Sequence, residues 1–470
     1  MIDTKALRQK ILDLAIRGKL VEQDPNNEPA SLLIARIKAE KEQLIKEKKI
    51  KKEKPLPPIK ADEIPFQIPN GWEWVRLGDI IQLVSGQDFN SSLYFDEPHE
   101  HSVPYITGAS NIENNRVIIN RWTDTPKSIA IKDDLLIVCK GSVGKTAYLE
   151  EEKAHIARQI MAVRMIYGLD RFYIGTAIHA KVDDIVRSQK GIIPGIERST
   201  MLNLAISLPP IKEQKRIVAK IEELFAQVDA IEKAQNDLVE LKKIAKQKVL
   251  DLAIRGKLVE QDPNNEPASL LIARIKAEKE QLIKEKKIKK EKPLPPIKAD
   301  EIPFQIPNGW EWVRLGDIIQ LVSGQDFNSS LYFDEPHEHS VPYITGASNI
   351  ENNRVIINRW TDTPKSIAIK DDLLIVCKGS VGKTAYLEEE KAHIARQIMA
   401  VRMIYGLDRF YIGTAIHAKV DDIVRSQKGI IPGIERSTML NLAISLPPIK
   451  EQKRIVAKIE ELFEQIDLIR

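Results

Sequence analysis

The sequence has little cysteine and no long apolar run, and each absence narrows what the chain can be. Only two cysteines occur in 470 residues, Cys139 and Cys377. Two cysteines so far apart form neither a disulfide framework nor a CxxC metal site, and they suit a reducing compartment. No apolar run approaches the roughly 18 residues of a transmembrane helix, and the N-terminus lacks the apolar core of a signal peptide. We therefore expect a cytoplasmic protein.

The sequence also lacks the motifs that identify common active sites. HExxH, GxSxG, GxGxxG and the Asn-Pro-Pro-Tyr/Phe signature of base-modifying methyltransferases do not occur. His99 and His101 have no third metal ligand at a useful spacing, which favours an exposed loop. Residues 140–146 end in Gly-Lys-Thr, but Cys139 replaces the first glycine of a P-loop. We predict that the chain is not an enzyme and binds no metal.

What the sequence does contain is a copy of itself. Residues 12–225 recur unchanged as residues 250–463, at an offset of 238. This period is the size of a domain with its connector, and it far exceeds a solenoid repeat. With 43% apolar residues the chain can bury two sizeable cores. The net charge of +4 is too small to imply a polyanionic partner unless positive charge is clustered.

A long helix is predicted in the middle of the chain, from Lys212 to Arg255. Apolar residues recur there every seven positions from Ile217 onward, and a second apolar set follows four residues after the first. This spacing is typical of a helix packed along another helix. The helix would be roughly 65 Å long at about 1.5 Å per residue. Pro209–Pro210 bars helix upstream, and Gly256 provides a stop.

The repeat also predicts what packs against this helix. By the offset, Leu7 and Leu14 correspond to its second half, whereas Ile455, Leu462 and Ile469 correspond to its first half. The two termini would then meet in space and rebuild a second rod, antiparallel to the first. We predict a pseudo-two-fold symmetric molecule with a pair of long antiparallel coiled-coil helices.

Between its helical segments each repeat predicts a mixed globular domain. Strand candidates are residues 72–84, which include a turn, and residues 117–119, 135–139, 160–164 and 204–208. Helix is expected over residues 170–186. Strands and helices alternate without a βαβ rhythm, so the expected class is α+β. The expected division is 1–64 for N-terminal helices and linker, 65–210 for the first domain, 211–302 for the long helix, a second helix and linker, 303–448 for the second domain, and 449–470 for a C-terminal helix.

A run of charge occupies residues 46–54, between a predicted helix and a proline-rich extended connector. Lysine dominates this run. The more favoured interpretation is a solvated helix end that leads into a linker. Contact with phosphate or docking to a partner is the alternative.

Polar side chains suited to DNA recur at predicted loops. Asn and Gln match the edge of adenine and Arg matches guanine. The small-residue loop 140–146 carries lysines and hydroxyls that can approach a phosphate backbone, although a plain glycine turn is the alternative. Together these residues favour DNA binding, while each alone suits an ordinary surface. The candidates are Gln87, Asn111, Lys140, Ser142, Lys145, Thr146, Arg158 and Gln159, with Gln325, Asn349, Lys378, Ser380, Lys383, Thr384, Arg396 and Gln397 in the second repeat.

Two segments carry a resemblance to a known family. Residues 208–218 read Leu-Pro-Pro-Ile-Lys-Glu-Gln-Lys-Arg-Ile-Val, and residues 71–79 read Gly-Trp-Glu-Trp-Val-Arg-Leu-Gly-Asp. With residues 135–146 and 191–196, they resemble the DNA specificity subunit of Type I restriction-modification systems. The first signature returns at residues 446–456, so the resemblance covers nearly the whole chain.

The resemblance implies two target recognition domains held apart by the paired helices, each domain reading one half of a split site on double-stranded DNA. It implies a chain without catalysis or cofactor, which binds two methyltransferase subunits and, through the complex, restriction subunits. S-adenosylmethionine, ATP and Mg would belong to those partners. The family's two domains normally differ, whereas here they are identical, so a two-fold arrangement predicts a gapped palindromic target. A coiled-coil scaffold with protein-binding domains is the alternative.

Overall fold

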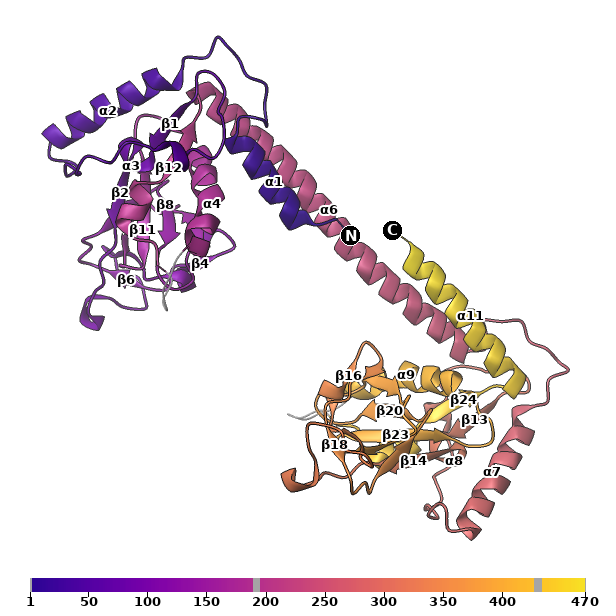
Figure 1. The fold of residues 1–470 in the computed structure, drawn as a ribbon. Coiled ribbons are helices and arrows are strands. Elements are labelled where there is room, and N and C mark those ends of the chain that lie inside the picture. The colour runs from indigo at the N-terminus through magenta and orange to yellow at the C-terminus, as the bar shows by residue number, and fades with distance from the viewer. Residues whose placement is uncertain (1, 189–194, 427–432, 470) are drawn as a thin grey trace. The chain divides into compact units, whose positions relative to one another are not determined.

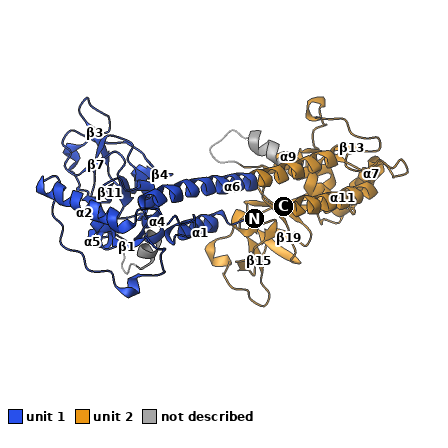
Figure 2. Ribbon diagram, turned by 90° about the horizontal axis from the view of Figure 1, so that it is seen from above, with its two compact units in different colours: residues 1–236 blue, residues 237–470 orange. Residues whose placement is uncertain are grey.

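The computed structural model describes residues 2–188, 195–426 and 433–469. The chain divides into two compact units, residues 1–236 and 237–470 (Figure 2). Most of the segment 191–196 lies outside the described residues. In the described part of the chain, no helix is both long and apolar enough to cross a membrane.

Unit 1 is a mixed α/β domain with helices at both ends of its sequence (Figure 1). Its helices are α1 Thr4–Ile16, α2 Ala30–Lys46, α3 Leu77–Ile80, α4 Arg171–Ser188, α5 Arg198–Leu202 and the start of α6 Ile211–Ile254. Its strands are β1 Glu73–Arg76, β2 Ile81–Ser85, β3 Val103–Ile106, β4 Ile112–Glu113, β5 Arg116–Val117, β6 Trp122–Thr123, β7 Ile129–Ile131, β8 Leu135–Val138, β9 Thr146–Tyr148, β10 Lys153–Ile156, β11 Ile160–Met165 and β12 Ala205–Leu208.

Unit 2 repeats these elements and ends in a helix of its own. Its helices after α6 are α7 Ala268–Lys284, α8 Leu315–Ile318, α9 Arg409–Ser426, α10 Arg436–Leu440 and α11 Ile449–Leu468. Its strands are β13 Glu311–Arg314, β14 Ile319–Ser323, β15 Val341–Ile344, β16 Ile350–Glu351, β17 Arg354–Val355, β18 Trp360–Thr361, β19 Ile367–Ile369, β20 Leu373–Val376, β21 Thr384–Tyr386, β22 Lys391–Ile394, β23 Ile398–Met403 and β24 Ala443–Leu446. The predicted α+β class and two domains are confirmed.

Two four-stranded sheets form the centre of unit 1, in the orders β2-β11-β8-β9 and β6-β3-β10-β7. The first is antiparallel throughout, and the second contains the parallel pair β3/β10. Leu136 and Val138 pack toward the second sheet, whereas Leu135 and Ile137 pack with the helices. Strand β8 is therefore buried on both faces, which explains its uninterrupted apolar sequence.

One predicted strand is interrupted in the structure. Residues 72–84 were expected to form strand with a turn, and the turn is the short helix α3 between β1 and β2. Strand β1 pairs antiparallel with β12, which directly precedes α6. This two-stranded sheet therefore joins the start of the domain to the start of the long helix.

In unit 1, α1 packs antiparallel along the first half of α6. Arg8, near the start of α1, pairs with Asp229, while Arg216 donates to the Glu22 carbonyl oxygen at 3.2 Å. Ile11 and Ile217 are buried in the same apolar cluster. Gly18 ends the helix with φ +64°, and a Cβ there would lie 2.4 Å from the Pro69 ring. Glycine is therefore required at this stop.

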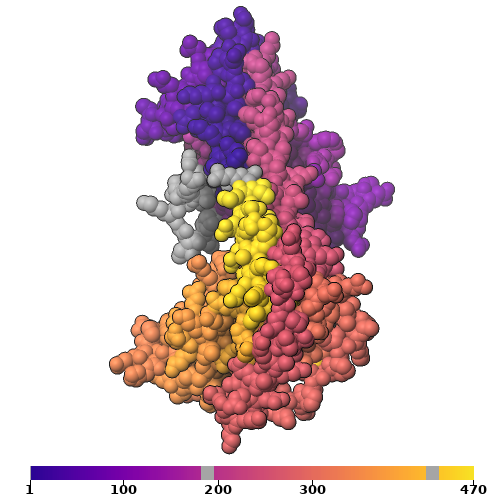
Figure 3. All heavy atoms as spheres, turned by 90° about the vertical axis from the view of Figure 1, so that its right-hand side faces the viewer, coloured from indigo at the N-terminus to yellow at the C-terminus, as the bar shows by residue number. Residues whose placement is uncertain are grey.

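In unit 2, α11 packs antiparallel along the second half of α6, as Figures 1 and 3 both show. Lys246 pairs with Asp467 at 2.8 Å, and Val249 and Ile455 share one buried cluster. Lys242 donates to the Asp467 carbonyl oxygen at 3.0 Å and so satisfies a terminal acceptor of α11. The predicted antiparallel pairing of each terminal helix is thus confirmed within each unit.

Candidate DNA interface

One end of the sheet β2-β11-β8-β9 gathers three loops in unit 1. The end of β2, Ser85, lies opposite Met161 near the start of β11. The end of β8, Val138, lies opposite Ile160, and the start of β9 follows from the next loop. The segment after β2, the β8–β9 loop and the β10–β11 turn therefore leave the sheet on the same side.

Most of the residues predicted from the sequence lie on these three loops, which we call the reading loops: residues 86–89, 140–145 and 157–159. Six of the eight candidates are exposed there, and unit 2 repeats the arrangement at its equivalent positions. The exposed candidates are Gln87, Lys140, Ser142, Lys145, Arg158 and Gln159, with Gln325, Lys378, Ser380, Lys383, Arg396 and Gln397 in unit 2.

Asn111 is a structural residue in this fold. Its side chain is fully buried, and Oδ1 accepts from the amides of Thr107 at 3.0 Å and Gly108 at 3.3 Å. Its Nδ2 donates to the Ile118 carbonyl oxygen and to Asn120 Oδ1. No hydrogen-bonding group of the amide is left for a base. The candidates Asn111 and Asn349 therefore hold the loop after β3 and β15 in shape.

Thr146 is also withdrawn from the surface. It opens β9 and is only 5% exposed, and its equivalent Thr384 is 9% exposed. Alternation along the strand turns this position inward, because successive side chains of a strand point to opposite faces. The hydroxyls of these two candidates are therefore not available to a DNA backbone in this conformation.

Two reading loops approach each other closely at Gly86. A Cβ at this position would lie 1.9 Å from the Ala157 carbonyl oxygen, so only glycine fits. Beyond it, Asp88 pairs with Arg158 at 2.6 Å and also accepts from the Arg158 amide at 3.0 Å. These contacts bring Gln87 beside the β10–β11 turn.

His155 is buried beneath the loop that follows β2 and holds it in place. It was not among the sequence candidates. It is fully buried and stacks on Phe89 with 4.0 Å between the ring centroids. Its Nδ1 accepts from the amides of Lys127 and Ser128, so Nε2 carries the proton and donates to the Gln87 carbonyl oxygen at 2.8 Å. Burial lowers the pKa of His155, which keeps the ring neutral.

The β8–β9 loop is shaped by its glycines. Gly141 and Gly144 have φ +81° and +91°, a region that L side chains rarely adopt. Lys140 is exposed at the start of the loop. Lys145 is also exposed, but its Nζ lies 3.3 Å from the Ile112 carbonyl oxygen, which ties the loop to the base of the β4–β5 hairpin. The loop is a cationic glycine turn.

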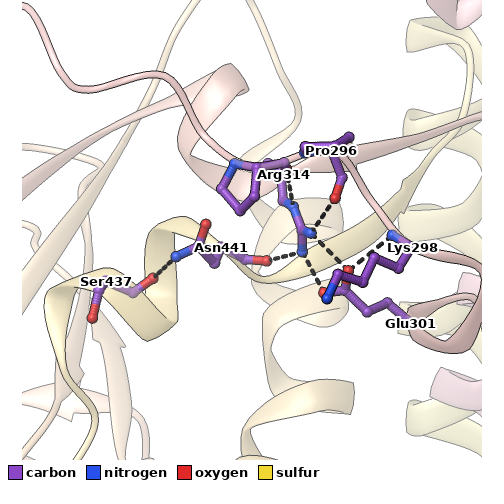
Figure 4. A network of polar contacts seen from close by, with 7 residues as sticks. Pro296, Lys298, Glu301, Arg314, Ser437 and Asn441 are labelled. Carbon is purple, nitrogen blue, oxygen red and sulfur yellow. Dashed lines mark hydrogen bonds and ion pairs between the residues drawn. The ribbon is translucent and has the colours of Figure 1, made fainter.

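The residues that carry the resemblance are largely structural. Arg314 of unit 2 is 4% exposed and binds both oxygens of Glu301 at 2.6 and 2.8 Å (Figure 4). The same guanidinium donates to the carbonyl oxygens of Pro296 and Asn441. It lowers the pKa of Glu301 to about 2. This network, with its copy at Arg76 in unit 1, fastens the proline-rich connector to the domain.

The glutamate and glutamine of the second signature hold the start of α6. Gln214 donates to the Pro209 carbonyl oxygen and accepts from the Asp170 amide. Glu213 is 1% exposed, and burial raises its pKa although the neighbouring Gln23 and Trp72 act to lower it. The signature therefore joins the long helix to the domain.

Catalytic or metal chemistry finds no support in the described parts of the two units. No three His, Cys, Asp or Glu side chains gather there into a possible metal site. His99 stacks on Phe95 in an exposed loop. Cys139 is buried, and burial raises the pKa of its thiol. The two units thus present the same set of exposed polar loops at one end of the main sheet.

Comparison with known proteins identifies the family. The family model described as Type I restriction modification DNA specificity domain matches residues 69–241 and 307–470. The Type I restriction enzyme EcoEI specificity subunit of Escherichia coli is 31% identical over 550 residues, covering 99% of this chain and 90% of its own length. The EcoAI specificity subunit of the same organism is 30% identical, with coverage of 99% and 90%.

Solved structures show the same fold. A chain from a study of complex assembly and conformational transition in the type I R-M system aligns with a TM-score of 0.60 at 21% identity, covering 86% of this chain and 93% of its own. The HsdS subunit from Thermoanaerobacter tengcongensis aligns with a TM-score of 0.51 at 20% identity, covering 86% and 92%. The chain belongs to the family of Type I restriction-modification DNA specificity subunits, which direct the complex to its DNA target and are not themselves enzymes.

Proposed function

We propose that each unit reads one half of a bipartite DNA site with its reading loops. The observation that supports this most directly is the gathering of six exposed polar side chains at one end of a rigid sheet. Gln87, Arg158 and Gln159 have the hydrogen-bonding geometry that suits base edges in the major groove. Lys140 and Lys145 carry the positive charge that positions a phosphate backbone.

We infer that the target is a gapped palindrome. Residues 12–225 and 250–463 are identical, so both domains recognise the same bases. Each terminal helix pairs antiparallel with its own half of α6, which supports a two-fold arrangement completed by the termini. Two identical readers related by a two-fold axis contact identical half-sites on opposite strands. The spacer between the half-sites then depends on the length of α6.

We also propose the composition of the complex. Two methyltransferase subunits, one for each half-site, would bind this chain, and restriction subunits would join through the complex. S-adenosylmethionine, ATP and Mg would be bound by those partner subunits. This proposal rests on the family and on the two copies of the domain. A scaffold with purely protein-binding domains would retain no DNA, which separates the two functions experimentally.

Methylome sequencing of cells that carry the chain with its partner subunits tests the palindrome. We expect a methylated motif with two inverted arms, and a motif with unrelated arms would refute it. Replacing Gln87 and Gln325 by Ala should change the accepted bases in both arms. The matched control replaces Lys132 and Lys370, which are exposed at the opposite end of β8 and β20, and should leave the motif unchanged.

A further inference from the structure

A cleft follows the free edge of the main sheet in each unit. Strand β2 is the outermost strand of its sheet, and the cleft of about 700 Å³ lies between its edge and the segment after α2. Unit 2 has the same cleft along β14, with a volume of about 690 Å³. The lysine-rich run at residues 46–54 therefore does not simply leave the domain, because residues 49–53 line this cleft.

The cleft holds more positive than negative charge. Seven cationic side chains line it, and carboxylates neutralise three: Lys49 pairs with Glu47, Arg164 with Asp134 and Arg198 with Glu53. The other four are Lys41, Lys51, Lys52 and Lys127, and no ion pair within the described residues involves them. The whole chain has a net charge of only +4, so this is the clustering that binding to a polyanion requires.

Lys41 is the most informative of these four cations. It lies half-buried on α2, and its ammonium donates to the Gly78 carbonyl oxygen. Its equivalent Lys279 donates to the carbonyl oxygens of Gly316 at 2.6 Å and Ile319 at 3.0 Å. Burial lowers the pKa of Lys41. Asp79 and Glu53 offset part of the cost of this desolvation, and no carboxylate forms an ion pair with Lys41 within the described residues. An anion entering the cleft would offset more of that cost.

An added peptide strand does not fit the edge of β2. Arg198 donates to the Leu83 carbonyl oxygen at 2.8 Å and to Ser85 Oγ at 3.0 Å. In unit 2, Lys279 occupies the Ile319 carbonyl oxygen in the same way. These side chains take the main-chain acceptors that a pairing strand would need. The anionic ligand must therefore interact with side-chain charges rather than extend the sheet.

The cleft is continuous with the reading loops. Lys127 lines the cleft, and its Nζ lies 5.9 Å from the centroid of the Phe89 ring, two residues after Gln87. The Lys127 amide donates to the same His155 ring that binds the Gln87 carbonyl oxygen. The five residues of β2 extend over about 16 Å at 3.3 Å per residue, so the cleft can follow a short stretch of one DNA backbone.

We propose that this cleft binds the phosphate backbone of the DNA that flanks each half-site, with Lys41, Lys51, Lys52 and Lys127 as the contacting cations. The location of the flanking DNA rests on the proposed function of the reading loops. Because phosphate contacts carry no base information, the cleft adds affinity for any sequence and leaves the recognised bases unchanged. A duplex is too wide to enter, so the sugar-phosphate ridge of one strand occupies the cleft.

The test uses the full-length chain with a fluorescent 30-base-pair duplex of arbitrary sequence, whose Kd is measured by anisotropy between about 50 and 200 mM salt. The cleft variant carries six Lys→Gln changes, at Lys51, Lys52, Lys127, Lys289, Lys290 and Lys365. The matched control carries six Lys→Gln changes at exposed lysines outside the cleft: Lys19, Lys38, Lys153, Lys257, Lys276 and Lys391.

The plot of log K against log salt has a negative slope, and each lost phosphate contact makes it shallower by about 0.9. We expect the cleft variant to lose at least about 2 from this slope and to weaken about tenfold or more at low salt, while the control keeps the native slope. A cleft variant with the native slope would overturn the proposal. If that variant also stopped co-purifying with its methyltransferase subunits, the cleft would belong to an acidic segment of that partner.

The reading loops are tested separately. Gln87→Ala with Gln325→Ala should change the methylated bases and leave the salt slope of the arbitrary duplex unchanged. If the Gln87/Gln325 variant methylates altered bases while the cleft variant keeps the native salt slope, the cleft proposal is rejected and the proposed role of the reading loops is retained. Thermal melting of the cleft and control variants at equal concentration verifies that both are folded. If either melting temperature falls strongly, the same salt-slope measurement is made on variants that carry two of the substitutions at a time.

Discussion

Replacement of His155 by Phe is the sharpest test of how the reading loops are held. Phe fills the space beside Phe89 but cannot hydrogen-bond. The amides of Lys127 and Ser128 lose their acceptor, and the Gln87 carbonyl oxygen loses its donor. Each buried group left without a partner costs about 1–3 kcal/mol. We expect unit 1 to lose about 3 kcal/mol or more and its reading loops to lose their fixed position.

The duplication supplies an internal control for this change. His393 has the same contacts in unit 2, with 2.8 Å to the Gln325 carbonyl oxygen, and remains intact in the single variant. Calorimetry should show one transition shifted down and one unchanged. Methylation should decline on sites that need both arms. His99→Phe is the matched control, because His99 is exposed and stacks on Phe95 without holding a reading loop.

The same ring predicts a dependence on pH. Burial lowers the pKa of His155 below its ordinary value of 6.5, so the fold favours the neutral ring. Its stabilising contribution is complete above pH 6.5 and is lost as pH falls below that value, because the unfolded chain then gains a proton that the folded ring resists. The native chain should lose stability on acidification more steeply than the double variant at His155 and His393. Equal pH profiles, or a single variant that melts and methylates like the native chain, would refute the reasoning.

Three further changes have expected outcomes. Gly86→Ala with Gly324→Ala places a methyl group 1.9 Å from a carbonyl oxygen, so methylation assays should show loss of site recognition while the helical far-UV signal persists. Removal of seven residues from the middle of α6 should change the preferred spacer and keep the half-site bases; spacer-variant substrates with unshifted preference would contradict this. Glu213→Gln removes a buried charge whose pKa is raised, so it should raise the melting temperature near pH 7. This gain should disappear toward pH 4, where the native carboxyl is protonated. An equal gain in melting temperature at both pH values would contradict the raised pKa.

The large features of the fold could be predicted because they depend on periodicity and repetition. The apolar spacing of α6 identifies a packed helix, and the repeat offset identifies which terminal segment packs on which half. The uninterrupted apolar run at residues 135–138 identifies a strand buried on both faces. In each case many residues carry the same signal, so tertiary contacts reinforce what local sequence already favours.

The candidate site was less predictable because single polar residues look alike in sequence. Asn111 has the same amide as a base-reading side chain, but its own backbone neighbours use every hydrogen-bonding group. Thr146 was assigned from a loop motif, and strand alternation turns it inward. His155 was not among the sequence candidates, because it belongs to none of the motifs that identify a functional histidine. The one available signal was its place in an apolar strand, where a buried imidazole must find hydrogen bonds.

The cations over the free edge of β2 have a consequence for the folding of a duplicated chain. Two identical segments in one polypeptide are prone to exchange strands during synthesis, because an edge in one copy accepts its counterpart from the other as readily as its own neighbour. Arg198 occupies a main-chain acceptor of β2, and Arg436 and Lys279 occupy acceptors of β14 in the second copy. A guarded edge of this kind disfavours pairing with the other copy, which is the hazard that an exact duplication would otherwise increase.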